Sequence, residues 1–198
     1  MLKYVKNETQ LQYNIRKDFK MYKIDKQFDF AYGHRVWSQT LNPKFSIDSK
    51  LICRHLHGHQ GKLKIGLQSE TLNLGMVTDF KHLNCIKKII DDVFDHKFIM
   101  DIHDPLFNDV FREIKTFKIP LIDCKFYKVP DLSNLSIKFS NAEFEKLEGL
   151  VVVDFVPTSE NICKLFFDLA SDMLSELGIS VSFVEFWETP KSHCRYEI

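Results

Sequence analysis

The chain has 198 residues, of which 44% are hydrophobic and 27% charged, so it can fold around one core but is too short for two large domains. Its 27 basic residues balance its 27 acidic residues, which argues against nucleic acid or an anionic membrane as a partner, and no stretch approaches the roughly 18 apolar residues of a membrane span. The five cysteines are odd in number and scattered, which argues against a disulfide framework and favours a reducing, cytoplasmic setting.

Two strands are the first elements predicted. Apolar residues recur at even spacing from Tyr22 to Tyr32, as in a half-buried strand, and His34 lies at its far end. A second strand carries the segment 53–59 and continues to Leu67. We expect these two strands to be neighbours, because a turn-rich stretch joins them.

Two amphipathic helices are also predicted. Asp79 can cap a helix in which apolar residues recur three or four apart as far as Phe94. A second helix begins after Pro157 and ends at Gly178. Two further strands are predicted, at 150–153 and 181–188. This order of strands and helices is typical of an α+β domain with an antiparallel sheet.

The segment 101–150 is broken by three prolines and interrupts this pattern. Its alternating apolar residues predict a hairpin, and Ser140 followed by Glu143 has the form of a capping box that opens a short helix. We interpret the segment as an insertion within one domain of residues 1–198. An insertion of this length usually covers a site or extends a subunit contact. The Lys-containing N-terminus is treated as a further extension.

Three histidines are candidate metal ligands. His57 and His59 lie two residues apart on a predicted strand, so both imidazoles point to one face. His34, at the end of the neighbouring strand, can supply a third nitrogen, and three histidines with an open fourth position suit catalytic zinc. His55 shares the parity of the pair and remains an alternative ligand. We rank it below His34, because a bend before His57 would turn it away.

Cys53 lies four residues before this pair. A thiol close to a divalent cation has a lowered pKa and can act as a base near neutral pH. The alternative is a small buried hydrophobic residue, which is how most free cysteines behave. Asp95 and His96 follow the first helix, where the carboxylate can orient the imidazole for proton transfer. They can equally be a helix end, where histidine is favourable.

Glu188 ends the last predicted strand among apolar neighbours. A carboxylate in such a setting needs a hydrogen-bond donor, and a ligand with adjacent N–H groups would supply one. The alternative is an exposed acid at the rim of the domain. Thr158 and Ser159 open the second helix, and capping explains them without a ligand. The same helix end also offers free N–H groups to a ligand.

Six motifs occur together in one order, over roughly residues 22–100 and 150–198. They are FDFAYGHR, C-x3-H-G-H, GMVTDF, FDHK, PTSEN and the late WET. With these motifs the chain resembles the 6-pyruvoyl-tetrahydropterin synthase and 6-carboxytetrahydropterin synthase family. One departure is Gln60-Gly61, where that family usually has Asn-Tyr.

The resemblance implies a T-fold: a four-stranded antiparallel sheet with two helices on one face. Subunits of this fold join into a barrel, usually as a homohexamer of two trimers with sites between subunits. The implied roles are zinc binding by His34, His57 and His59, a general base at Cys53, a proton relay at Asp95 and His96, and pterin binding by Glu188, Thr158 and Ser159.

Within the family, the short C-x3-H-x-H spacing is similar to that of the queuosine-pathway branch. The resemblance then implies conversion of 7,8-dihydroneopterin triphosphate to 6-carboxy-5,6,7,8-tetrahydropterin, with release of acetaldehyde and triphosphate. One alternative is the same fold making 6-pyruvoyl-tetrahydropterin or acting on a related pterin. An alternative from another class is a non-catalytic, zinc-stabilised assembly protein.

Overall fold

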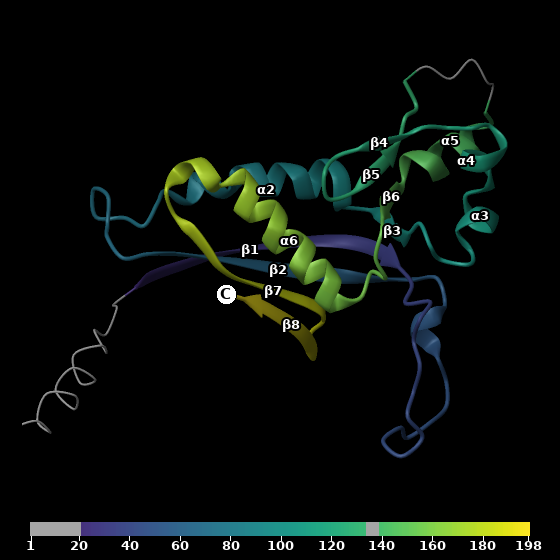
Figure 1. The fold of residues 1–198 in the computed structure, drawn as a ribbon, viewed down its shortest axis with the longest axis horizontal. Coiled ribbons are helices and arrows are strands. Elements are labelled where there is room, and N and C mark those ends of the chain that lie inside the picture. The colour runs from purple at the N-terminus through teal and green to yellow at the C-terminus, as the bar shows by residue number, and fades with distance from the viewer. Residues whose placement is uncertain (1–20, 134–138) are drawn as a thin grey trace, which may run out of the picture.

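The structure is a computed structural model that describes residues 21–133 and 139–198. The N-terminal extension and part of the segment used to predict the hairpin lie outside these residues. The described chain forms one eight-stranded sheet with helices over it (Figure 1). The strands are β1 (Tyr22–His34), β2 (His57–Ser69), β3 (Lys97–Asp101), β4 (Leu121–Asp123), β5 (Lys128–Pro130), β6 (Leu150–Val153), β7 (Ser180–Thr189) and β8 (Ser192–Glu197).

The helices lie mostly where the sequence predicts them. They are α2 (Asn84–Ile89), α3 (Phe107–Val110), α4 (Arg112–Thr116), α5 (Asn141–Glu148) and α6 (Ser159–Met173), with 3-10 turns η1 (Ile52–Arg54), η2 (Phe80–Leu83) and η4 (Ser175–Leu177) and a π-helical turn η3 (Ile90–Phe94). The first predicted helix is thus divided into η2, α2 and η3. Asp79 caps its start by accepting from the Lys81 amide, as predicted.

The α+β class is confirmed, but the prediction of a four-stranded antiparallel sheet is wrong. The strand order is β4-β5-β6-β3-β1-β2-β7-β8, and β3 pairs in parallel with both β1 and β6. The antiparallel half consists of β1, β2, β7 and β8, of which β8 was not predicted, whereas the predicted strand 150–153 is β6 in the other half of the sheet. Strand β3 has five residues, and so short an apolar run carries no period that identifies a strand.

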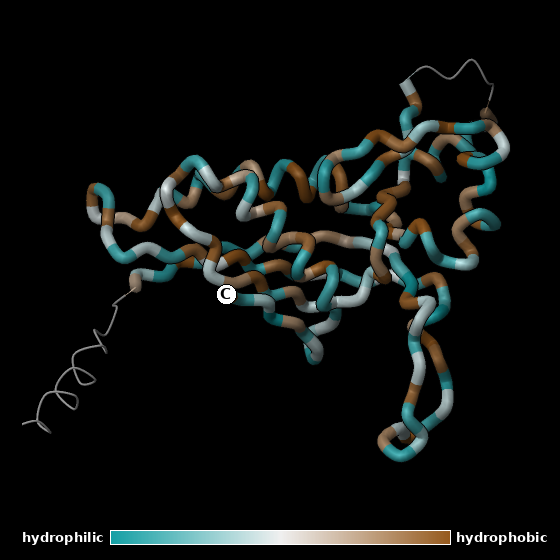
Figure 2. The backbone as a smooth tube through the Cα atoms, viewed as in Figure 1, coloured by the Kyte–Doolittle hydropathy of each residue, from teal (hydrophilic) through white to brown (hydrophobic). Residues whose placement is uncertain are grey.

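The main core lies between the antiparallel half of the sheet and the helices that cover one face of it (Figure 1). In the register, Phe28 lies opposite Leu63 and Tyr32 opposite His59, so apolar residues share the face turned to the helices. Hydrophilic residues alternate with them along β1 and β2 (Figure 2). Phe166 of α6 packs into this layer, with its ring centroid 5.7 Å from that of Phe30. We call this side of the sheet the inner face.

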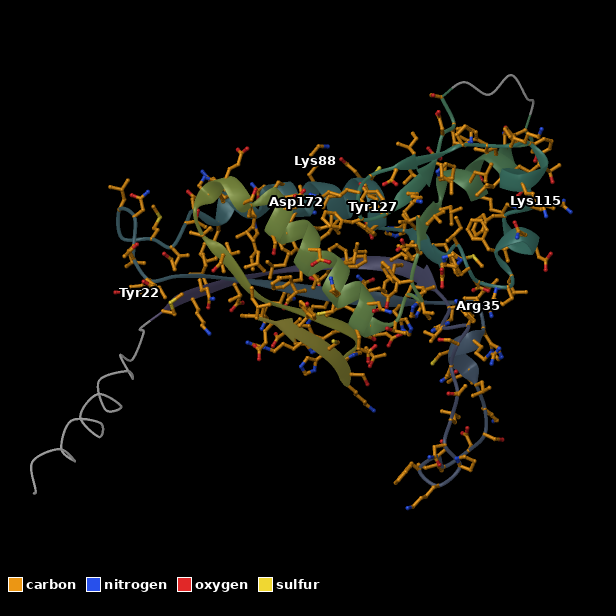
Figure 3. All side chains as sticks on the ribbon, in the orientation of Figure 1. Tyr22, Arg35, Lys88, Lys115, Tyr127 and Asp172 are labelled. Atoms are coloured by element: carbon orange, nitrogen blue, oxygen red, sulfur yellow. The ribbon has the colours of Figure 1, made fainter. Side chains whose placement is uncertain are left out.

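The insertion has a small core of its own, formed by Met100, Phe107, Phe111, Ile119, Leu147, Leu150 and Val152. Helix α5 opens with the predicted capping box between Ser140 and Glu143. Tyr127, labelled in Figure 3, packs its ring against Phe94 and so joins the β4-β5 hairpin to the main core. The insertion is therefore built onto the sheet through strands β4 to β6.

The far end of β1 is fixed to the start of the insertion. Arg35, labelled in Figure 3, is 7% exposed and places its Nε 2.9 Å from a buried Asp104 oxygen. The Trp37 indole N–H donates to Asp101 at 2.9 Å. From this point the connection to β2 runs out from the body of the molecule (Figure 1). None of the helices in the described part of the chain is long and apolar enough to cross a bilayer.

Candidate active site and metal centre

Three histidines and a glutamate gather at one end of the inner face. Each of His34, His57, His59 and Glu188 offers one ligand atom, and these four atoms lie within 4.8 Å of one another. The sheet register explains the arrangement, because His34 is paired with His57 and the third histidine lies two residues along β2. Strand β7 carries the glutamate to the same end of the sheet. We call these four residues the histidine group.

Backbone carbonyl groups orient two of the imidazoles. His34 is fully buried, and its Nδ1 lies 2.6 Å from the Pro157 carbonyl oxygen, to which it donates. His57 Nδ1 donates in the same way to the His55 carbonyl at 2.8 Å. With Nδ1 protonated, the Nε2 lone pair of a neutral ring is free to bind a metal ion. Metal-binding histidines usually donate such a hydrogen bond from the ring nitrogen that does not bind the metal.

Glu188 closes the group on its fourth side. Its Oε1 lies 3.0 Å from Nε2 of both His34 and His59, and its Oε2 accepts from the Ser159 hydroxyl at 2.9 Å. The hydrogen bond with His34 is the largest cause that lowers the pKa of Glu188, to about 2. Burial lowers the pKa of His59, although the Glu188 charge opposes the shift. An ionised carboxylate therefore lies in contact with two imidazole rings.

The donor set fits a divalent cation. A neutral His34, with its proton on Nδ1, would point an Nε2 lone pair at a carboxylate lone pair only 3.0 Å away, which is unfavourable without a positive charge between the atoms. A second proton or a metal ion supplies that charge, whereas a neutral His59 can carry its proton on Nε2 and donate to Glu188. Three imidazole nitrogens with a carboxylate oxygen are ligands that zinc accepts in a tetrahedral site.

Cys53 contributes no atom to the histidine group. It belongs to the 3-10 turn η1, not to the predicted strand, because β2 begins only at His57. The Val36 amide donates to its carbonyl at 2.7 Å, and its own amide donates to Gln39 at 3.1 Å. These contacts hold the thiol residue next to the end of β1. The bend also keeps His55 outside the group, as we expected.

Asp95 and His96 form a pair at the edge of β1. The Asp95 Oδ1 lies 3.0 Å from His96 Nδ1 and accepts from the Ala31 amide at 2.8 Å. Burial alone would raise the pKa of Asp95, but the Ala31 amide and the His96 ring outweigh it and lower that pKa. His96 has a left-handed backbone, with φ of 59°, and donates its amide to the Ala31 carbonyl at 2.7 Å.

This pair borders a pocket that also reaches part of the histidine group. The pocket, of about 850 Å³, is lined by His96, by Ala31 and Gly33 of β1, by Phe111 of the insertion, and by His57 and His59 of β2. Ala31 and Gly33 alternate along β1 with Tyr32 and His34, so their outward sides belong to the opposite face of the sheet. We call this hollow the outer pocket. Within one chain, His57, His59 and His96 border this pocket, whereas His34 and Glu188 are not part of its lining.

Three features of the site were missed from the sequence. The Pro157 carbonyl orients His34, the Glu188 carboxylate contacts two of the histidines, and Tyr32 is buried beside them. A backbone carbonyl has no sequence signature, and Tyr32 has the spacing of an ordinary core residue. Thr158 is confirmed as the N-cap of α6, where its hydroxyl accepts from the Asn161 amide.

Comparison with known proteins gives consistent matches along most of the chain. A family model described as 6-pyruvoyl tetrahydropterin synthase matches residues 23–198. A 6-carboxy-5,6,7,8-tetrahydropterin synthase from Aquifex aeolicus is 30% identical over 187 residues, which cover 89% of this chain and 98% of that enzyme. These matches span the histidine group, Asp95 and the insertion.

Two solved structures are similar in fold. An uncharacterized protein from Wolinella succinogenes is 49% identical, with a TM-score of 0.85 over 90% of this chain and 98% of that one. The 6-pyruvoyl tetrahydropterin synthase of Caenorhabditis elegans is 20% identical, with a TM-score of 0.51 over 90% of this chain and 96% of that one. The second likeness concerns the fold alone.

Proposed function

The chain belongs to the 6-pyruvoyl tetrahydropterin synthase family, and from this we propose that it is a 6-carboxy-5,6,7,8-tetrahydropterin synthase. The substrate is 7,8-dihydroneopterin triphosphate, and the products are 6-carboxytetrahydropterin, acetaldehyde and triphosphate. The observation that carries the proposal is the 30% identity with a named 6-carboxy-5,6,7,8-tetrahydropterin synthase over nearly the whole of that enzyme. The short spacing between Cys53 and His57 supports the same branch.

The proposed metal is zinc, held by His34, His57 and His59. The two carbonyl contacts support this assignment, because they fix the tautomer in which Nε2 is the ligand atom. When bound, zinc supplies a Lewis acid that polarises the hydroxyl groups of the substrate side chain. The three rings also orient that side chain, since they come from paired strands of a rigid sheet.

Glu188 is proposed to anchor the pterin. An ionised carboxylate can accept two parallel hydrogen bonds from the guanidine-like edge of the ring, and the low pKa of Glu188 keeps it ionised. Ser159 donates to one of its oxygens and so holds its orientation. Thr158, at the N-terminus of α6, places Ser159 for this contact and is proposed to assist in binding the pterin. If Glu188 is instead a fourth metal ligand, its replacement should lower metal affinity.

Cys53 is proposed to be the general base. Its place in η1, next to the end of β1, brings the thiol near the histidine group without occupying a ligand position. A nearby cation favours the thiolate, which can then remove a proton from the substrate side chain. The alternative, a buried structural cysteine, fits less well because Cys53 is partly exposed.

The proton relay of Asp95 and His96 is proposed to act on a site completed by another subunit. His96 is 80% exposed and borders the outer pocket, so its ring is accessible to a second chain. Within one chain His96 gives no atom to the histidine group, although His57 and His59 also border the outer pocket. A neighbouring copy that seats its Cys53 region against the outer pocket would join the base to the relay.

The sheet also has edges that such an assembly requires. Strand β8 is at one end of the strand order, and β3 pairs with β1 only at Tyr32 and Gly33. Most of β1 and all of β8 therefore expose unpaired backbone groups in the described chain, and such edges favour pairing with another strand. We propose a barrel of three copies that stack as a hexamer, in a cytoplasmic enzyme of queuosine biosynthesis.

The test is product analysis. Purified protein loaded with zinc is incubated with 7,8-dihydroneopterin triphosphate, the pterin is identified by mass spectrometry and acetaldehyde is trapped. The proposal predicts a carboxylated tetrahydropterin and one acetaldehyde for each turnover. A pyruvoyl product without acetaldehyde would move the chain to the other branch of the family. Absence of turnover would favour the non-catalytic assembly protein.

A further inference from the structure

Tyr32 is a buried polar residue that the proposed mechanism does not use. It lies on the inner face of β1 and is 3% exposed. Its ring centroid is 5.1 Å from that of His34 and 5.8 Å from that of His59, so it lies directly beneath the histidine group. Its hydroxyl oxygen is buried and has no hydrogen-bond partner among the described residues.

The packing fixes the position of this ring. Gly61 on the neighbouring strand leaves the space that the ring fills, because a Cβ atom there would lie 3.0 Å from Tyr32 Cε1. Phe30 and Phe186 hold the ring from two other sides, at centroid distances of 5.5 Å and 5.6 Å. The hydroxyl therefore cannot reach solvent by a simple rotation of the side chain.

An unpartnered buried hydroxyl is costly, and its retention points to a partner in another state of the protein. A phenol is protonated near neutral pH, so this hydroxyl is available as a donor. Glu188 is the neighbouring acceptor, because its Oε1 lies 3.0 Å from Nε2 of both histidines against which the Tyr32 ring packs. In the ligand-free chain that carboxylate is turned to His34 and His59.

The histidine contacts of Glu188 depend on the protons of the rings. Once His34 and His59 serve as metal ligands through Nε2, neither ring offers Glu188 a proton. The carboxylate then keeps the Ser159 hydroxyl as a donor and needs a second one. We propose that the Tyr32 hydroxyl becomes this donor in the metal-loaded protein and positions Glu188 for the pterin. The inference rests on the proposed function and adds a positioning residue to it.

The experiment compares Tyr32→Phe with Tyr196→Phe, a matched loss of one phenol hydroxyl on β8, where the Tyr196 ring packs against Phe167. Binding of 7,8-dihydroneopterin to the zinc-loaded proteins is measured by calorimetric titration, and Tm is measured on the metal-free proteins. For Tyr32→Phe we expect pterin affinity to fall by about ten- to a hundredfold, as for one lost hydrogen bond to a charged group. Its Tm should not fall, because the hydroxyl has no partner in the metal-free chain.

Two results would overturn the inference. One is unchanged pterin affinity in Tyr32→Phe while the wild type binds. The other is a lowered Tm in the metal-free variant, which would show that the hydroxyl already has a partner there. A wild type that binds zinc but no pterin would instead overturn the proposed function, and the inference with it.

A second comparison tests whether Tyr32 acts through Glu188. In a Glu188→Ala background the carboxylate acceptor is gone, so adding Tyr32→Phe should change pterin affinity by no more than about twofold. If the two changes instead multiply, Tyr32 contacts the ligand or the metal ligands independently, and its assignment as a positioning residue is wrong.

Discussion

The histidine group and the Asp95–His96 pair differ in how completely a single chain builds them. In the histidine group His34 is fully buried, two rings are oriented by backbone carbonyls and Glu188 closes the fourth side. At the outer pocket Asp95 holds the backbone of Ala31, but the His96 ring is 80% exposed. The histidine group is therefore complete within one chain, whereas the His96 ring is accessible to a ligand or a second chain.

This difference separates what folding provides from what assembly must provide. The strand register alone brings the three histidines together, so metal binding should survive in any form of the protein that keeps β1 and β2 paired. The Asp95–His96 pair has its carboxylate and imidazole 3.0 Å apart, but its imidazole is 80% exposed and gives no atom to the histidine group. Metal binding and turnover should consequently respond to different changes.

The largest effect is expected from His57→Ala. It removes one of three nitrogen ligands from a site fixed by the sheet, so zinc should no longer copurify and turnover should be lost. Metal content by mass spectrometry and rate of acetaldehyde release measure the two effects. His55→Ala is the matched control, because its side chain lies outside the histidine group and only its backbone carbonyl contacts His57. Loss of zinc in the control as well would show that His55 is a ligand.

Cys53→Ala should affect turnover and leave the metal in place. Removal of a general base typically lowers the rate by about 10²- to 10⁴-fold. Zinc content should stay at the wild-type level, because Cys53 gives no atom to the histidine group. Cys85→Ala, a partly exposed thiol on α2, is the control. A Cys53→Ala rate near that of the wild type would contradict the assignment of the base.

Much of the inner face could be predicted from the sequence, because local rules determine it. His34, His57 and His59 follow from strand parity, and the caps at Asp79, Thr158 and Ser140 follow from side chains that accept from nearby amides. Strand parity and helix capping each involve only residues close together in sequence and a fixed local geometry. They therefore do not depend on how distant parts of the chain pack.

The sheet beyond β1 could not be predicted in this way. Strand β3 is short and pairs in parallel with β1 and β6, and β6, although predicted as a strand, pairs with β3 in parallel and with β5 antiparallel. Such pairing depends on the packing of the insertion core, which no period in the sequence reveals. The same limit explains why Asp95 and His96 could be named as a pair, whereas the pocket that His96 shares with Phe111 of the insertion could not be predicted.

Mixing two inactive variants tests the shared site directly. Cys53→Ala and His96→Ala subunits, unfolded together and refolded, should recover activity if the base and the relay of one site come from different chains. With random mixing, about a quarter of the sites would combine two intact contributions, as expected for a heterologous contact between identical subunits. Each variant refolded alone is the control. No recovery above the controls would place both groups in the same chain.

The smallest effect is expected from Ser140→Ala, which distinguishes the two regions by stability. Ser140 exchanges hydrogen bonds with Glu143 at the start of α5, and the same helix supplies Glu145 and Lys146 to the wall of the outer pocket. Loss of the capping box should lower the free energy of unfolding by about 1 kcal/mol, measured by urea denaturation. Ser49→Ala, in the exposed connection between β1 and β2, should have no measurable effect.

Zinc content should be unchanged in both variants, because the histidine group depends on β1, β2 and β7 and not on the insertion. A loss of zinc in Ser140→Ala would instead show that the two faces are coupled within one chain.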